Sequence, residues 1–170
     1  MSLSDCIRDV PDFPKEGIIF KDITPLLANP AALADAVDQL IAPYVDAGVE
    51  AVVGVESRGF IFGSLAAAKL GVSFVPIRKP GKLPYESVGY EYELEYGTNR
   101  LEMHVDAIQP GQKVLIIDDL LATGGTAAAT CKLVRKLGGE VVACCFVVEL
   151  GFLDGRAKLD DVLVNSLAIF

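Results

Sequence analysis

Two adjacent carboxylates and a glycine-rich turn lie close together in this 170-residue chain. An apolar run at residues 114–117 leads into Asp118 and Asp119, and a turn of small residues at 122–126 precedes a helical pattern. Backbone N–H groups at the start of a helix bind phosphate well. Carboxylates are suited to accept hydrogen bonds from sugar hydroxyls. The spacing therefore predicts a site for a sugar phosphate.

The turn differs from the P-loop that binds nucleoside triphosphates. That loop needs a Lys after its last Gly, whereas Gly124 and Gly125 are followed by Thr126. A strand-turn-helix corner, in which the glycines only permit a sharp bend, is the alternative for Thr-Gly-Gly-Thr alone. Two neighbouring carboxylates repel each other and gain nothing from packing, so their presence favours a binding site.

The surrounding elements alternate between apolar runs and helical patterns. We expect strands at 51–55, 73–77, 113–117 and 140–148, and helices at 30–44, at 59–70 and from the turn to Leu137. This order predicts a parallel sheet with helices on both faces, which binds ligands beyond the carboxyl ends of its strands. Residues 56–59, Arg78 with Lys79, and the two aspartates should therefore meet in one cleft.

Residues 79–104 interrupt this alternation. Pro80, Gly81 and Pro84 open the segment, and polar and apolar residues alternate through 90–96, which predicts a protruding hairpin. Such an excursion is either a functional lid or a structural hairpin at a dimer interface.

Composition excludes several classes of protein. The length suits one domain of α/β type, and a net charge of −8 argues against nucleic acid as a partner. With four cysteines in no Cys-x-x-Cys pair and one histidine, a zinc site is not expected, and reduced thiols are. The first residues lack signal-peptide features, and no apolar run reaches the ~18 residues of a membrane span. We expect a cytoplasmic protein that does not enter membranes.

Residues 118–126 resemble the phosphoribosyl-pyrophosphate signature of type I phosphoribosyltransferases, in the form found in the adenine-specific branch. The similarity extends in the family's order through residues 11–14, 17–23, 56–60, 77–84 and 94–97, and again at 148–150. It implies a type I phosphoribosyltransferase fold over residues 1–170, with a small N-terminal hood at about 1–30 and a flexible loop or hairpin at about 79–104. It also implies phosphoribosyl transfer from phosphoribosyl pyrophosphate (PRPP) to adenine, giving AMP and pyrophosphate in purine salvage.

The resemblance assigns roles around the donor. Asp118 and Asp119 would hold the ribose hydroxyls and stabilise a cationic sugar, and the turn would hold the 5′-phosphate. The peptide between Glu56 and Ser57 would be cis and present N–H groups to pyrophosphate. The residues expected to bind PRPP or AMP are Ser57, Arg58, Arg78, Lys79, Lys82, Tyr96, Asp118, Asp119, Ala122, Thr123, Gly124, Gly125 and Thr126.

The cations and the metal of the donor site need separate comment. Arg78, Lys79 and Lys82 follow a strand that should end at the cleft, but a solvated charged turn is the usual fate of such a run. Mg²⁺ is the expected cofactor, and without a dense carboxylate cage it would be held mainly by substrate oxygens and water, with no direct protein ligand.

The base would be held by the segment that resembles the family's hood. Phe20 would stack on adenine, although a core aromatic is the alternative, while the backbone of Ile19 and Lys21 reads its edge and Leu120 packs on the other face. Lys21 stands where some family members carry Arg, so the role of its side chain stays open.

The resemblance makes Glu95 the group that handles the proton at the base, and so a catalytic residue with Asp118 and Asp119. By spacing alone, Glu91, Glu93 and Glu102 are equally suitable. The sole histidine, His104, is expected in a surface or packing role. Tyr96 and Arg78 would act across the interface of a homodimer.

Two rival functions share these arguments. A phosphoribosyltransferase for hypoxanthine, guanine, xanthine or orotate would differ only in the hood. A non-catalytic regulator that binds PRPP usually carries a nucleic-acid-binding module or a basic surface, neither of which this acidic sequence shows.

Overall fold

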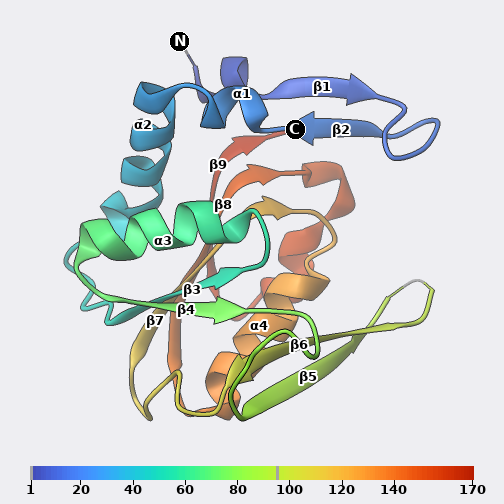
Figure 1. The fold of residues 1–170 in the computed structure, drawn as a ribbon. Coiled ribbons are helices and arrows are strands. Elements are labelled where there is room, and N and C mark those ends of the chain that lie inside the picture. The colour runs from blue at the N-terminus through green and yellow to red at the C-terminus, as the bar shows by residue number, and fades with distance from the viewer. Residues whose placement is uncertain (1, 95) are drawn as a thin grey trace.

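A five-stranded parallel sheet forms the centre of the computed structural model, which describes residues 2–94 and 96–170. The strand order is β4-β3-β7-β8-β9, and every neighbouring pair is parallel, as the sequence predicted (Figure 1). The strands are β3 (Ala51–Val55), β4 (Ser73–Ile77), β7 (Lys113–Leu121), β8 (Glu140–Glu149) and β9 (Leu163–Ile169).

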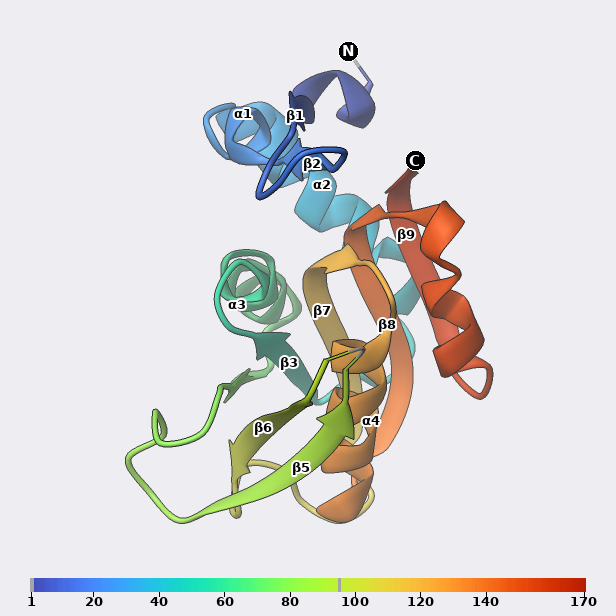
Figure 2. The same cartoon turned by 90° about the vertical axis from the view of Figure 1, so that its right-hand side faces the viewer.

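Helices cover both faces of this sheet. On one face α2 (Pro30–Ile41) and α3 (Gly59–Leu70) bury Leu40 and Phe62 against Leu115 and Ile117. On the other, α4 (Gly125–Lys136) and a hairpin enclose a second apolar cluster, so the molecule has three layers (Figure 2). The short helices are α1 (Thr24–Leu27), η1 (Leu3–Cys6), η2 (Ala42–Tyr44), η3 (Gly151–Leu153) and η4 (Gly155–Leu159).

Local signals explain where the long helices begin and end. Pro30 occupies the first turn of α2, where its missing N–H costs nothing, and the Asn29 side chain accepts a hydrogen bond from the N–H of Ala32. The helix α3 ends at Gly71, whose φ of 69° is accessible to glycine at little cost.

Two antiparallel pairs lie outside the main sheet. β1 (Arg8–Pro11) pairs with β2 (Ile19–Asp22), within the predicted hood, and β5 (Ser87–Glu93) pairs with β6 (Thr98–His104), within the predicted hairpin. The hairpin packs against α4 through β5 (Figure 1).

The structure departs from the sequence-based expectation at two strands. β7 continues to Leu121, four residues beyond its predicted end, and β9 was not predicted at all. Both differences have a physical reason. Carboxylates are unfavourable in a buried strand, which made Asp118 look like a strand end, and β9 is a partly exposed edge strand whose apolar pattern is broken by Asn165 and Ser166.

The extension of β7 creates the opening in which the site lies. β3 pairs with β7 only from Val114 to Ile117, whereas β8 accompanies β7 as far as Leu121. One edge of β7 is therefore uncovered by β3 from Asp118 onward, and the start of α3 lies beside it.

In the part of the chain that the structure describes, none of the helices has the length and apolar character needed to span a membrane.

Candidate functional site

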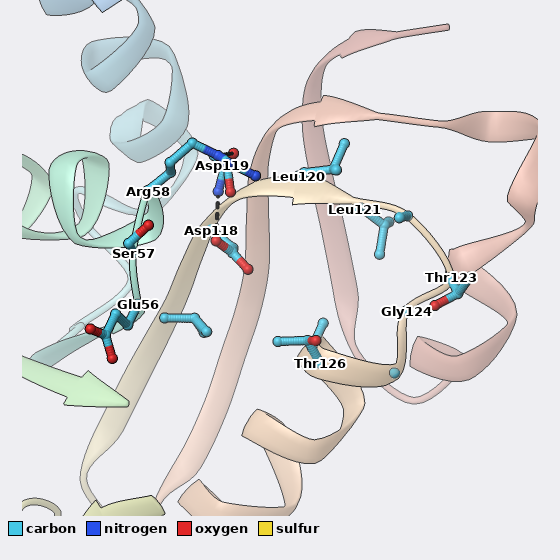
Figure 3. Close-up of a pocket in the computed structure, with 14 residues that line it drawn as sticks. Glu56, Ser57, Arg58, Asp118, Asp119, Leu120, Leu121, Thr123, Gly124 and Thr126 are labelled. Atoms are coloured by element: carbon cyan, nitrogen blue, oxygen red, sulfur yellow. Dashed lines mark hydrogen bonds and ion pairs between the residues drawn. The ribbon is translucent and has the colours of Figure 1, made fainter. Parts of the chain in front are cut away.

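A cavity of about 350 Å³ lies where β3 and β7 end, and most of the predicted donor-binding residues line it. Figure 3 shows side chains from two segments facing each other across it, residues 56–58 on one side and 118–126 on the other. The lining residues are Val55, Glu56, Ser57, Arg58, Asp118, Asp119, Leu120, Leu121, Ala122, Thr123, Gly124, Gly125, Thr126 and Ala127.

The two aspartates are distinguished by their partners. Arg58 Nε donates a hydrogen bond of 2.5 Å to Asp119 Oδ2, and the N–H of Asp119 donates one of 2.8 Å to Asp118 Oδ1 (Figure 3). Burial, together with the charge of Asp119, raises the pKa of Asp118 well above its usual range. Burial opposes the charge on Arg58, but the hydrogen bond and charge of Asp119 outweigh it and raise the pKa of Arg58. Asp119 is thus paired with a cation, whereas Asp118, which is half-buried, makes no ion pair with Arg58.

Gly59 lets the start of α3 approach Asp118. A Cβ at this position would lie 2.7 Å from Asp118 Oδ1 and 3.2 Å from the carbonyl oxygen of Ile117. Any larger residue would push α3 away from β7. The peptide bond between Glu56 and Ser57, which leads into this helix, is cis, as the resemblance implied.

The phosphate turn (residues 122–126) joins β7 to α4 and exposes backbone N–H groups at the start of that helix. Gly124 has a φ of 85°, in the left-handed region that favours glycine. The hydroxyls of Tyr92 and Thr126 are 3.1 Å apart, so β5 touches the turn from the hairpin side. Nothing here requires a bulky side chain, and the arrangement suits an anion held by backbone donors.

The cation cluster (Arg58, Arg78 and Lys82 with the carboxylates Glu56 and Asp119) lies beside the cavity. Arg78 donates from Nε and Nη2 to the two Glu56 oxygens, each at 3.0 Å, and Lys82 Nζ lies 3.3 Å from Glu56 Oε1. The hydrogen bonds from Arg78 hold the pKa of Glu56 at about 2. Lys79, predicted with them, is exposed. The structure thus brings Arg78 and Lys82 to the edge of the cavity through a carboxylate, rather than as free cations.

The hood contributes Phe20, which points toward Arg58. The Arg58 guanidinium carbon lies 5.7 Å from the centre of the Phe20 ring, and Phe13 meets that ring edge-on at 5.1 Å. Ile19 and Lys21 line a separate apolar cavity with residues that include Phe152 and Phe170. Lys21 Nζ lies 2.6 Å from Asp9 Oδ1 and 4.0 Å from the centre of the Phe170 ring. Phe20 alone of these three side chains is thus near the donor site.

The hairpin brings Tyr96 to the other side of the phosphate turn. Tyr96 is 88% exposed and lines a cavity of about 450 Å³ with Tyr92, Thr123 and Thr126, among others. Glu95, the predicted proton-handling group, lies outside the described residues. The ring of His104 packs edge-on against Tyr85 and its Nε2 accepts a hydrogen bond of 3.3 Å from the Tyr85 N–H, which is a packing role.

Among the site residues that the sequence did not predict, Glu56, Tyr92 and Gly155 have the clearest structural roles, and Val55, Leu121 and Ala127 also line the cavity. Glu56 was named only as part of a motif, although a carboxylate next to predicted cations is a signal for ion pairing. Tyr92 was visible only as one of several alternating hairpin residues. Gly155, whose backbone packs against the phosphate turn, gave no signal, because the contact joins segments about 30 residues apart.

Within residues 2–94 and 96–170, no group of three or more His, Cys, Asp or Glu is arranged to hold a metal ion. The paired carboxylates in this open cavity fit Mg²⁺, which in phosphate sites is commonly held largely by phosphate oxygens and water.

Comparisons with known proteins identify the class. A model of the phosphoribosyl transferase domain matches residues 23–164. The adenine phosphoribosyltransferase of Methylococcus capsulatus is 60% identical over 161 residues, covering 95% of this chain and 94% of the relative, and that of a Thermotoga species is 55% identical over 170 residues, covering 100% of both chains. The chain belongs to the phosphoribosyltransferase family, in the branch of the adenine phosphoribosyltransferases.

Solved structures agree with the assignment. The adenine phosphoribosyltransferase of Rhodothermus marinus superposes with a TM-score of 0.94 at 52% identity, covering 99% of this chain and 96% of the other. The enzyme of Saccharomyces cerevisiae, solved with adenine and an imino-altritol bisphosphate, superposes with a TM-score of 0.92 at 43% identity, covering 97% and 96% of the two chains. The expected type I phosphoribosyltransferase fold is confirmed.

Proposed function

We propose that the protein transfers the 5-phosphoribosyl group of PRPP to N9 of adenine, forming AMP and releasing pyrophosphate. The observation that carries this function is the meeting of a backbone phosphate turn and two carboxylates in one cavity of about 350 Å³. A sugar phosphate needs donors for its anion and acceptors for its hydroxyls, and this cavity offers both at neighbouring positions on one strand and turn.

The phosphate turn would hold the 5′-phosphate. Its members Ala122, Thr123, Gly124, Gly125 and Thr126 offer backbone N–H groups at the positive end of the α4 dipole, together with two threonine hydroxyls. Asp118 and Asp119 would then accept hydrogen bonds from the ribose hydroxyls. Their negative charge would stabilise positive charge that develops on the sugar as the bond to pyrophosphate breaks.

The pyrophosphate would be bound by Ser57, the cation cluster, Lys79 and Tyr96. In the structure Arg58 is paired with Asp119, and Arg78 and Lys82 are paired with Glu56. Pyrophosphate would compete with these carboxylates for the cations. An exchange at Arg58 would leave Asp119 free to accept from the ribose, so donor binding and ribose orientation would be coupled at this pair.

Adenine would lie between the hood and β7. Phe20 is supported as a stacking residue by its position beside Arg58, and Leu120, which lines the donor cavity, would contact the other face. The backbone of Ile19 and Lys21 would read the edge of the base. The Lys21 side chain is held by Asp9, which supports a structural rather than a base-reading role for it.

Glu95 would accept the proton lost from adenine nitrogen, or return it in the reverse reaction. Replacing Glu95 by Gln should lower kcat by about 100-fold, while the KM for PRPP changes little. A Glu93→Gln variant, two residues earlier in the sequence, is the matched control. Equal losses in kcat and in donor binding would assign Glu95 a positioning role.

Mg²⁺ would neutralise charge on the leaving pyrophosphate, held mainly by substrate oxygens and water. We also propose that the chain acts as a single domain in the cytoplasm, as a homodimer. Residues 1–30 would form its hood and residues 79–104 its lid, and Tyr96 and Arg78 would reach the partner's site.

A base panel tests the function most broadly. AMP formation from adenine and PRPP should require Mg²⁺ and be restored when it is added back. Hypoxanthine, guanine, xanthine and orotate should be used with far lower kcat/KM. Comparable efficiency on a 6-oxopurine would refute adenine specificity, and intact PRPP binding without AMP formation would favour a regulatory protein.

A further inference from the structure

The phosphate turn rests on a second glycine-containing segment, η4. A Cβ on Gly124 would collide with the carbonyl oxygen of Gly155 and lie 3.2 Å from its Cα. A Cβ on Gly155 would in turn collide with the carbonyl oxygen of Ala122. Gly155 is buried, so the two backbones lie in direct contact with no side chain between them. The shape of the turn therefore depends on where Gly155 is held.

Arg156, the residue after Gly155, is anchored by its side chain at two places. Its Nε and Nη2 donate to the two oxygens of Glu149 at 2.7 and 2.8 Å, and its Nη1 donates to the carbonyl of Val164 at 3.2 Å. Glu149 is 4% exposed, at the end of β8, and pairs in register with Leu121 of β7. The hydrogen bonds from Arg156 lower the pKa of Glu149, so the pair is ionised at neutral pH. A two-point contact of this kind fixes orientation as well as distance.

We propose that Arg156 is a positioning residue for the 5′-phosphate site. It would act through its bidentate salt bridge to Glu149, which is called the fork below. It lies outside the cavity lining, and acts by holding the Gly155 backbone against Ala122 and Gly124. This inference rests on the proposed function, because it takes the phosphate turn to be the 5′-phosphate site. It predicts that loss of the fork weakens binding at the phosphate turn and spares the pyrophosphate side.

The chain offers a matched control in the ion pair between Arg135 and Asp161, at 2.9 Å. This pair fastens the end of α4 to the stretch just after η4, and it is likewise an arginine–carboxylate contact. It lies at the opposite end of α4 from the phosphate turn. An Arg135→Met variant therefore removes a comparable tether without touching Gly155.

The test compares Arg156→Met, Arg156→Lys and Arg135→Met in the full-length protein, by calorimetric titration with ribose 5-phosphate and with Mg²⁺-pyrophosphate. Arg156→Met should weaken ribose 5-phosphate binding and raise the KM for PRPP by about tenfold, with kcat and pyrophosphate affinity within a factor of about two. Arg156→Lys keeps the charge but cannot form the fork, and should lie between wild type and Arg156→Met. Arg135→Met should bind ribose 5-phosphate as wild type does.

Three results would overturn the proposal: unchanged ribose 5-phosphate affinity in Arg156→Lys and Arg156→Met, an equal loss in Arg135→Met, or an equal loss for pyrophosphate. If Arg156→Met does not fold, Arg156→Lys decides. Binding of ribose 5-phosphate by the wild-type protein separates this inference from its premise, which is that the turn is the 5′-phosphate site. If wild type does not bind ribose 5-phosphate, the phosphate-turn assignment and the inference both fail, whereas tight wild-type binding with unaffected variants removes the inference alone.

Discussion

The phosphate turn lines the cavity and the cation cluster lies at its edge, and the two regions are built differently. The turn is backbone, held by its own glycine and by Gly155 of a neighbouring segment. The cation cluster is made of long side chains, each already paired with a carboxylate. An anion entering the turn meets donors that are in place, whereas one entering the cluster has to displace Glu56 or Asp119. The two ends of PRPP would therefore be bound in different ways. The 5′-phosphate would enter a preformed site, whereas the pyrophosphate would take the place of carboxylates that are paired with the cations.

The largest effect is expected where the two regions meet. Replacing both Asp118 and Asp119 by Asn should lower kcat by about 1,000-fold or more. The ribose hydroxyls would lose their charged acceptors, and the positive charge that develops on the sugar would no longer be stabilised. The fold should be retained, since neither side chain is part of the apolar core. Steady-state kinetics and circular dichroism check both points, with the exposed Asp46→Asn as control. Turnover near the wild-type rate would contradict the assigned role.

A substitution in the turn tests whether it is preformed. Gly124→Ala should raise the KM for PRPP by about 10- to 100-fold, because the new Cβ would push Gly155 away and distort the donors. Gly111→Ala is the matched control. Gly111 also has a left-handed φ, of 80°, but a Cβ there meets nothing within 4 Å. Both variants carry about 1–2 kcal/mol of backbone strain. If both raise the KM equally, strain rather than contact explains the loss.

If pyrophosphate must displace carboxylates from the cation cluster, a substitution there should strengthen binding, whereas a substitution in the turn should weaken it. Glu56→Gln removes the charge that holds Arg78 and Lys82, so pyrophosphate should bind about two- to fivefold more tightly, as measured by product inhibition. Glu93→Gln, on the hairpin, provides the control. Weaker binding in Glu56→Gln would mean that Glu56 orients Arg78 for the ligand, and the contrast between the two regions would be lost.

The smallest effect concerns stability and pH. Burial and the charge of Asp119 raise the pKa of Asp118 in the folded protein above its ordinary value of 3.8, so the folded state binds its proton more tightly than the unfolded state. The contribution of Asp118 therefore lowers the free energy of unfolding progressively as the pH rises from 3.8 to the raised pKa. Above the raised pKa the destabilisation is complete. Asp118→Asn keeps the acceptor for the Asp119 N–H and lacks this penalty. Its stability relative to wild type, from urea unfolding at several pH values, should increase with pH across that window. A difference independent of pH would contradict the raised pKa.

The sequence predicted the main architecture because the relevant signals are local. Residues 51–55, 59–70 and 73–77 appear in the structure with the predicted bounds, since apolar runs, an Ala-rich helix and Gly71 each act over a few residues. The sequence also predicted that residues 56–58 and 118–126 lie close together, because the carboxyl ends of parallel strands meet at one edge of a sheet.

What the sequence could not supply were partnerships between distant segments. An ion pair of Glu56 could have been expected, but its choice of Arg78 depends on tertiary positions that no short pattern encodes. The contact of Tyr92 with Thr126 and the packing of Gly155 on Gly124 depend on such positions in the same way. The same reason explains β9. An edge strand with polar interruptions is stabilised by its neighbour β8 rather than by its own apolar pattern.

The central claim is that the phosphate turn grips the terminal phosphate of the sugar while the two aspartates hold its hydroxyls. A crystal structure with AMP bound tests it most directly. The account predicts phosphate oxygens within hydrogen-bond distance of the backbone N–H groups of residues 123–126, and ribose hydroxyls on Asp118 and Asp119. A phosphate found instead against Arg78 and Lys82, with the turn empty, would contradict it.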